Sequence, residues 1–150
     1  MDGQIAQGPV PTTPLRDGER VLHQFHPDRA TYYRDHTWIA AGAMALGMIA
    51  LWLLGNPHVW TGAVGGLSAV AVRAFYLASD ELAARWDLTD QRLLGPATRA
   101  VNLGQIAQLR TLGSAVQVIT TTGDKHLLKY QADRHETRHR ISSASRVVSE

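Results

Sequence analysis

The longest apolar stretch of the chain lies in its first half, where no charged residue occurs between Asp35 and Arg73. A soluble amphipathic helix keeps a polar face, and neither half of this stretch has one. Residues 38–54 would span about 26 Å as a helix, close to the ~30 Å hydrocarbon core of a bilayer. Residues 55–58 (GNPH) then break the helix, and residues 59–77 supply a second apolar run. The pattern predicts a two-helix transmembrane hairpin, with a buried helical hairpin of a soluble bundle as the alternative.

The two apolar runs carry small residues at four-residue spacing. In a membrane, small side chains let two helix backbones approach closely and pack. The predicted helix-packing residues are Ala43 and Gly47 on the first run, and Gly62 and Gly66 on the second.

Polar segments with short alternating patterns precede and follow the apolar runs. Before them, residues 19–26 (ERVLHQFH) predict a short strand that ends at Pro27. After them, strand-like runs between turn signals predict a small antiparallel sheet, which a last helical run closes. The expected inner face of that helix is Thr137, Ile141, Ala144 and Val148.

This organisation predicts four parts of the chain. They are residues 1–18, a flexible N-terminal tail rich in Gly and Pro; residues 19–35, a leading strand and juxtamembrane connector; residues 38–77, the transmembrane hairpin; and residues 80–150, a cytoplasmic domain.

Residues 86–94 (WDLTDQRLL) form a compact motif in which two short apolar runs flank a tight turn. Thr89 and Asp90 are expected to hydrogen-bond the backbone of the turn. Arg92 is expected to form an ion pair with Asp87 or Asp90. The predicted motif residues are Trp86, Thr89, Asp90 and Arg92.

This motif resembles the aromatic-x-Leu-Thr-Asp-x-Arg-Leu hairpin of the bacterial pleckstrin-homology-like domain family, in its membrane-anchored form. Residues 101–106 (VNLGQI) resemble a second segment of that family, with Asn102 in place of a proline. The resemblance covers residues 18–145. It implies a membrane α+β protein, with a two-helix transmembrane hairpin plus a small pleckstrin-homology-like antiparallel sheet closed by a C-terminal helix. The family includes assembly factors for photosynthetic membrane complexes, so the resemblance also implies an assembly role.

One metal-binding pattern occurs, because residues 135–139 (HETRH) satisfy H-E-x-x-H. In zinc hydrolases two histidines one helical turn apart bind the metal and the glutamate is the general base, so His135 and His139 are candidate ligands. Zinc needs a third protein ligand, and the only carboxylate or imidazole after His139 belongs to the terminal residue, Glu150. The arginines beside the motif would also disfavour a bound dication. His126 or Asp133 would complete the site only if the fold brought one of them near. The sequence has no cysteine, and we expect no metal, no cofactor and no catalytic residue.

The expected function is that of a non-catalytic membrane protein whose cytoplasmic domain binds another protein. It would be an accessory subunit or an assembly factor in a bacterial inner (cytoplasmic) membrane. The expected partners are the lipid bilayer and other membrane-protein subunits or a second copy of the chain. Arginines flank both apolar runs and are absent from the turn, which predicts a multi-pass protein with both termini cytoplasmic.

The charge of the chain limits the choice of partner. The net charge is only +2, with cations and anions interspersed, which predicts no nucleic-acid partner. Two alternatives stay open: a small membrane metallohydrolase that uses the HETRH motif, and a module that senses anionic lipids. The second would use the arginines of the last helix, Arg134, Arg138, Arg140 and Arg146.

Overall fold

The computed structural model describes residues 8–149, and it describes side chains up to residue 146. The chain divides into two compact units. Arg29–Ser79 form the first unit, and Met1–Asp28 together with Asp80–Glu150 form the second. The first unit is therefore inserted into the second along the sequence.

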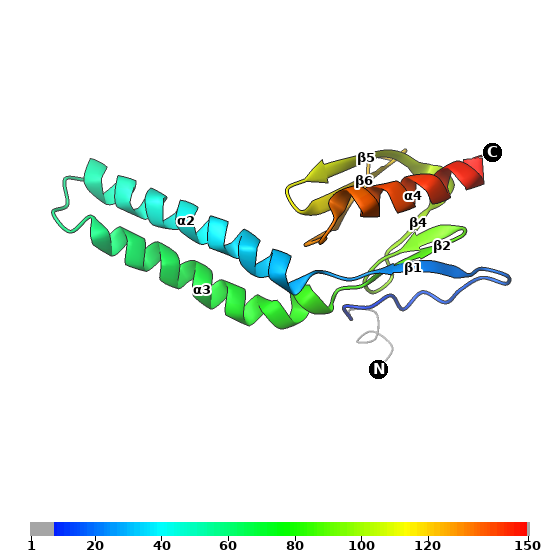
Figure 1. The fold of residues 1–150 in the computed structure, drawn as a ribbon, viewed down its shortest axis with the longest axis horizontal. Coiled ribbons are helices and arrows are strands. Elements are labelled where there is room, and N and C mark those ends of the chain that lie inside the picture. Colours follow the sequence, from blue (N-terminus) through cyan, green and yellow to red (C-terminus); the bar gives the residue numbers. More distant parts are fainter. Residues whose placement is uncertain (1–7, 150) are drawn as a thin grey trace. The chain divides into compact units, whose positions relative to one another are not determined.

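The inserted unit is a pair of long helices, α2 (Arg29–Leu53) and α3 (Trp60–Ala83), which Figure 1 shows side by side. The apolar runs are predicted at 38–54 and 59–77, and each helix is longer than its run. The predicted connector is helical from Arg29 onward, because no glycine or proline occurs between Pro27 and Gly42. The final turn of α3 continues to Ala83 and belongs to the second unit.

The turn between the helices begins at Gly55, which has a φ of +71°. The N–H of Gly55 donates to the carbonyl of Trp52 at 3.0 Å, and the N–H of Asn56 donates to that of Leu51 at 2.9 Å. These two hydrogen bonds satisfy carbonyl groups that the end of α2 leaves without helical partners. Glycine suits this position because it adopts the left-handed conformation without a steric penalty.

The second unit consists of two small antiparallel sheets and a C-terminal helix, α4. The strand order is β1-β2-β3-β4 in the first sheet and β5-β6-β7 in the second. The elements are β1 (Val21–Phe25), β2 (Trp86–Thr89), β3 (Arg92–Leu94), β4 (Ala100–Asn102), the 3₁₀ turn η1 (Leu103–Gln105), β5 (Ile106–Leu112), β6 (Ala115–Thr120), β7 (Lys125–Leu128) and α4 (Arg134–Ser149).

The prediction of one small sheet is corrected to two. The reason lies at η1, where the chain leaves the first sheet before β5 begins. The side chain of Leu103 is buried there, and its N–H donates to the carbonyl of Gln91 at 3.1 Å. Because Leu103 is anchored in the core, the backbone bends at this point and the strands do not continue as one meander.

The leading strand belongs to the first sheet. In β1, Phe25 pairs with Trp86 and Gln24 pairs with Asp87 of β2. The predicted separation of residues 19–35 from the domain after residue 80 therefore does not match the pairing. Instead, the two helices are an insertion between two neighbouring strands.

The segment before β1 also differs from the predicted flexible tail over its described part. Pro11 forms a parallel bridge with Ala97, and the N–H of Thr12 donates to the carbonyl of Ala97 at 2.9 Å. The N–H of Ala97 in turn donates to the carbonyl of Val10 at 3.1 Å. The predicted tail over residues 1–7 lies outside the described residues.

The core of the second unit lies between the sheets and α4. The side chain of Ile141 is fully buried in it, Thr137 is buried, and Ala144 packs against the cluster. The predicted inner face of the helix is thus confirmed for these three residues, while the side chain of Val148 lies outside the described residues. Figure 1 shows α4 alongside β5 and β6, with which it is in contact. The buried cluster is Phe25, Trp86, Leu88, Leu93, Val101, Leu103, Val116, Val118, Leu128 and Ile141.

Candidate functional site

The turn between β2 and β3 is organised by the buried side chain of Thr89. Its Oγ1 accepts hydrogen bonds from the N–H of Gln91 at 3.1 Å and from the N–H of Arg92 at 2.8 Å. The hydroxyl proton has two acceptors in range, Glu19 Oε1 at 2.7 Å and the carbonyl of Arg92 at 3.0 Å. Thr89 therefore connects the turn to the segment that precedes β1.

The neighbouring Asp90 contacts that same segment. Its Oδ1 accepts a hydrogen bond from the N–H of Arg20 at 3.1 Å, and its own N–H donates to the carbonyl of Arg20 at 3.1 Å. Asp90 thus extends the pairing of β1 with β2 by one residue. The sequence predicts instead that its side chain bonds the backbone of its own turn.

The partner of Arg92 differs from the prediction. Arg92 pairs with Glu19 rather than with Asp87 or Asp90, with an Nη2–Oε2 distance of 2.7 Å and an Nε–Oε1 distance of 3.0 Å. The exposed fractions of the two side chains are only 7% and 0%. Arg85 takes Asp87 instead, at an Nε–Oδ1 distance of 2.9 Å.

In this buried pair each side chain stabilises the charged form of the other. Hydrogen bonds from the Arg92 guanidinium lower the pKa of Glu19 to about 2, against the opposing effect of burial. The Glu19 carboxylate also accepts from the N–H of Arg16 at 2.8 Å. The Nη2 of Arg92 donates further to the carbonyl of Pro14 at 3.0 Å. The motif residues therefore fix the N-terminal segment against the sheet, and their polar atoms are engaged within the fold.

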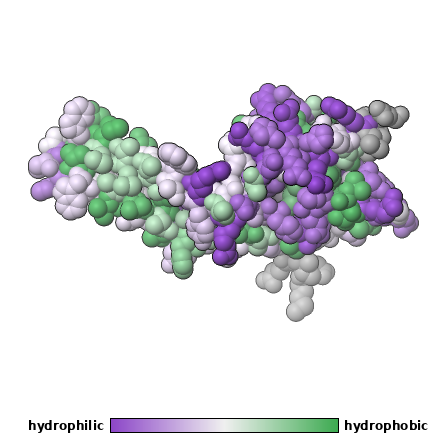
Figure 2. Space-filling model, viewed as in Figure 1, coloured by the Kyte–Doolittle hydropathy of each residue, from purple (hydrophilic) through white to green (hydrophobic). Residues whose placement is uncertain are grey.

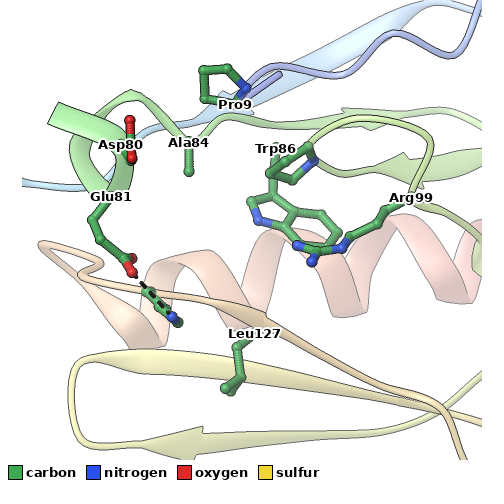
Figure 3. A pocket seen from close by; sticks show the side chains of 9 residues that line it. Pro9, Asp80, Glu81, Ala84, Trp86, Arg99 and Leu127 are labelled. Atoms are coloured by element: carbon green, nitrogen blue, oxygen red, sulfur yellow. Dashed lines mark ion pairs between the residues drawn. The ribbon is translucent and has the colours of Figure 1, made fainter. Parts of the chain in front are cut away.

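A cavity of about 460 Å³ opens beside Trp86 (Figure 3). The indole is buried and packs on Gly95, where a Cβ would come within 2.5 Å of the ring. Figure 3 shows the side chain of Arg99 reaching toward the indole. The residues that line the cavity are Pro9, Asp80, Glu81, Ala84, Trp86, Pro96, Arg99, Leu127 and Lys129.

The cavity has charged groups at its margin. Lys129 Nζ lies 3.5 Å from Glu81 Oε1, and this ion pair is drawn in Figure 3. Asp80 comes from the final turn of α3 and Arg99 from the loop between β3 and β4, and both are exposed. The ring of His126 contacts the indole edge-on at a centroid distance of 6.0 Å, and burial lowers its pKa, so it adds no charge near neutral pH.

The loop that carries Arg99 is held in an unusual conformation. Ala97 has a φ of +59°, a region that residues with a Cβ adopt rarely. The hydrogen bonds that Ala97 makes with Val10 and Thr12 hold it there. The N-terminal segment thus fixes the loop, and it also contributes Pro9 to the cavity wall.

The HETRH motif lies on the exposed side of α4. His135 and His139 are exposed, and Glu136 pairs with Arg140 at 2.8 Å. Asp133 accepts hydrogen bonds from the N–H groups of His135 and Glu136, each at 3.0 Å, and so caps the helix. Within residues 8–149, no group of three His, Cys, Asp or Glu side chains is placed to hold a metal ion.

We expect zinc to bind the full-length protein at less than about a tenth of an equivalent after incubation with the metal and gel filtration. The physical reason is that two exposed histidines without a third ligand make a poor zinc site. Elemental analysis of the wild type and of His135→Ala measures this. One equivalent of zinc that disappears in His135→Ala would contradict the expectation.

The predicted helix-packing residues meet in two opposed pairs. A Cβ added at Gly62 would strike the backbone of Gly47, and one added at Gly66 would lie 2.5 Å from the carbonyl oxygen of Ala43. The sequence pattern did not indicate a third contact, in which the buried Tyr32 donates its hydroxyl to the carbonyl of Ala74 at 2.7 Å.

The arginines of α4 face different partners. Arg134 donates to the carbonyl of Gly113, and Arg140 is held by Glu136. Arg138 and Arg146 are exposed. Arg134 and Arg140 thus already have partners within the domain, which weakens the case for a surface that recognises anionic lipids.

Comparisons of the chain with protein-family models, with curated proteins and with solved structures found no match.

Proposed function

We propose that this chain is an integral membrane protein, anchored by α2 and α3, whose second unit binds another membrane protein without catalysing a reaction. In this proposal the protein is an accessory subunit or an assembly factor in a bacterial inner membrane. The second unit is its cytoplasmic, pleckstrin-homology-like domain.

The observation that carries the proposal is the exposure of the apolar helices. In their most apolar 18-residue windows, only 6% of α2 and 11% of α3 is buried. Large side chains of the two helices, such as Trp38, Leu53 and Phe75, have exposed fractions of 74%, 72% and 81%. Figure 2 shows apolar residues on the surface of the hairpin. In a soluble protein, helices this apolar would be covered by other parts of the fold. Two helices of 25 and 24 residues are long enough to cross a bilayer.

The architecture of the second unit supports a binding role. Four strands, then three strands, then a closing helix suit a pleckstrin-homology-like domain. The polar side chains of the β2–β3 motif are engaged with the segment that precedes β1, so they offer no reactive group to a substrate. Within the described sheets β1, β4, β5 and β7 are edge strands, and an edge strand can accept an extended segment of a partner.

Gentle-detergent purification from the native membrane, followed by mass spectrometry, tests the binding role. A membrane protein in near-equal amount should accompany the wild type. A variant with a destabilised domain, Arg92→Met, should keep the hairpin and lose the partner. Recovery of the wild type alone, at the size of one chain, would count against the proposal, and a partner retained by Arg92→Met would assign recognition to the hairpin.

The topology gives a second expected result. Because the chain has no cysteine, single cysteines can report each side of the membrane. A membrane-impermeant maleimide should label Asn56→Cys in intact cells, since the turn lies opposite the arginine-rich flanks. Asp17→Cys and Ser143→Cys, both at exposed positions, should react only after permeabilisation. The reverse pattern would place the folded domain outside the cytoplasm.

A further inference from the structure

The cavity beside Trp86 has groups of both charges at its margin. Glu81 and Lys129 form an ion pair with each other and leave no net charge between them. No ion pair is recorded for Asp80 or Arg99 among the described residues, and both line the same cavity. The cavity therefore offers one carboxylate and one guanidinium to a ligand that carries a cation and an anion together.

The cavity walls suit the uncharged part of such a ligand. Trp86, Leu127 and Pro9 supply apolar surface to the cavity wall (Figure 3). Its volume of about 460 Å³ falls in the usual range of small-molecule sites. A bound group would thus bury a short carbon chain as well as its two charges.

The position of the cavity along the chain indicates the source of the ligand. Asp80 and Glu81 lie in α3 just after the apolar run that ends at Leu77. At 1.5 Å per residue, Asp80 is about 5 Å beyond that end. The polar headgroup layer is roughly 5–8 Å thick on each side of a bilayer. Given the membrane anchoring proposed above, on which this step rests, the two carboxylates lie at headgroup level.

We propose that this cavity binds the phosphoethanolamine headgroup of a membrane phospholipid. The primary ammonium donates hydrogen bonds to Asp80, with Glu81 beside it, and the phosphate accepts from the guanidinium of Arg99. The ethanolamine carbons pack on Trp86.

The same groups discriminate against the other common headgroups. A choline headgroup carries the same charges, but its quaternary nitrogen has no proton to donate to a carboxylate. A glycerol headgroup carries the phosphate without a cation, so the carboxylate of Asp80 would repel it. The preference for ethanolamine therefore comes from Asp80, and the affinity for phosphate comes from Arg99.

Native mass spectrometry of the full chain in detergent micelles tests this. Phosphatidylethanolamine, phosphatidylcholine and phosphatidylglycerol with identical acyl chains are added at equal concentration. We expect the ethanolamine lipid to be bound about fivefold or more over each of the others. Equal binding of the three lipids, or a preference for phosphatidylglycerol, would overturn the proposal.

Three variants locate the site. Arg99→Gln should weaken binding of the ethanolamine lipid about tenfold, because it removes a charge-assisted hydrogen bond to phosphate. Asp80→Asn should remove the preference over the choline lipid. Arg110→Gln, at an exposed arginine of β5 outside the cavity, is the matched control and should bind as the wild type does. An equal loss in Arg99→Gln and Arg110→Gln would show that the cavity is not the site.

Two further measurements complete the test. The first distinguishes a lipid from a free headgroup as the ligand, and the second distinguishes failure of the headgroup site from failure of the membrane anchoring. Soluble glycerophosphoethanolamine should compete poorly with the lipid, and competition at equal concentration would overturn the lipid assignment. Alkaline carbonate extraction tests the anchoring by itself. A protein that stays in the membrane pellet without a lipid preference would refute only the headgroup site. A protein that carbonate releases would refute the anchoring, and the headgroup site with it.

Discussion

Replacing Arg92 with methionine is expected to lower the free energy of unfolding of the second unit by about 3 kcal/mol. The substitution keeps most of the side-chain volume but leaves the carboxylate of Glu19 buried without its cation. Only the hydroxyl of Thr89 and the N–H of Arg16 would still donate to it. A buried charge with its ion-pair partner removed is strongly destabilising, because the desolvation penalty of the charge remains.

Urea denaturation of the full chain in detergent measures this effect. Trp86 is the only tryptophan of the second unit, so its fluorescence reports unfolding once the other three are replaced by phenylalanine. Arg110→Met, at an exposed arginine, is the matched control and should change the free energy by less than about 0.5 kcal/mol. The double variant Glu19→Gln with Arg92→Met should recover part of the loss. Equal effects of Arg92→Met and Arg110→Met would show that the pair is not buried in solution.

The pH dependence provides an independent check on the same pair. The pKa of Glu19 is lowered from 4.5 to about 2 in the folded chain, so the carboxylate binds its proton more weakly there than in the unfolded chain. The stabilisation is therefore complete above pH 4.5 and is lost as the pH falls toward 2. The wild type should lose stability over this interval. Arg92→Met should lose less, because the guanidinium that lowers this pKa is gone.

The elements that sequence could predict are those whose signal is local. The charge-free interval between Asp35 and Arg73 is a property of neighbouring residues, and so is the alternation in residues 19–26. Both elements are present, as α2 with α3 and as β1. The helical face with Ile141 at its centre follows in the same way from a spacing of three and four residues.

The contacts that sequence missed join distant segments. Glu19 and Arg92 are separated by 73 positions, with the two helices between them, and nothing near Arg92 indicates that its partner precedes the hairpin. The spacing within the motif instead predicts Asp87 or Asp90 as the ion-pair partner of Arg92, because both are closer to it in sequence. The cavity beside Trp86 combines residues from the N-terminal segment, α3, the β3–β4 loop and β7. Such a site depends on how the strands are ordered, and no local pattern specifies that order.

The HETRH motif shows a different limit of local patterns: the spacing of its histidines is predicted correctly, but the spacing alone does not make a metal site. Helical periodicity correctly places His135 and His139 one turn apart on α4. The motif does not specify a third ligand. Two residues are candidates for that ligand, but Asp133 caps the helix and His126 contacts Trp86. A two-residue spacing is thus compatible with a solvated helix as well as with a zinc site.

Replacing Gly66 with leucine is expected to destabilise the pairing of α2 with α3 by about 2 kcal/mol. A Cβ at this position would lie 2.5 Å from the carbonyl oxygen of Ala43, which is shorter than real Cβ contacts. The opposing atoms belong to the backbone, so no side chain can rotate to make room. The helices must separate, and the close packing that holds two helices together in lipid is lost.

The adjacent Gly65 provides a matched control, because a Cβ there would have no atom within 4 Å. Gly65→Leu adds the same side chain to the same helix, one residue away and on its exposed side. Any change in membrane partitioning or helix propensity is common to both variants, so their difference isolates the contact with Ala43. Unfolding in mixed SDS micelles, followed by energy transfer between dyes on cysteines introduced at Ile39 and Val72, measures the separation. Gly66→Leu should unfold at a lower SDS fraction than Gly65→Leu, and coincident transitions would show that Gly66 does not form the packing face.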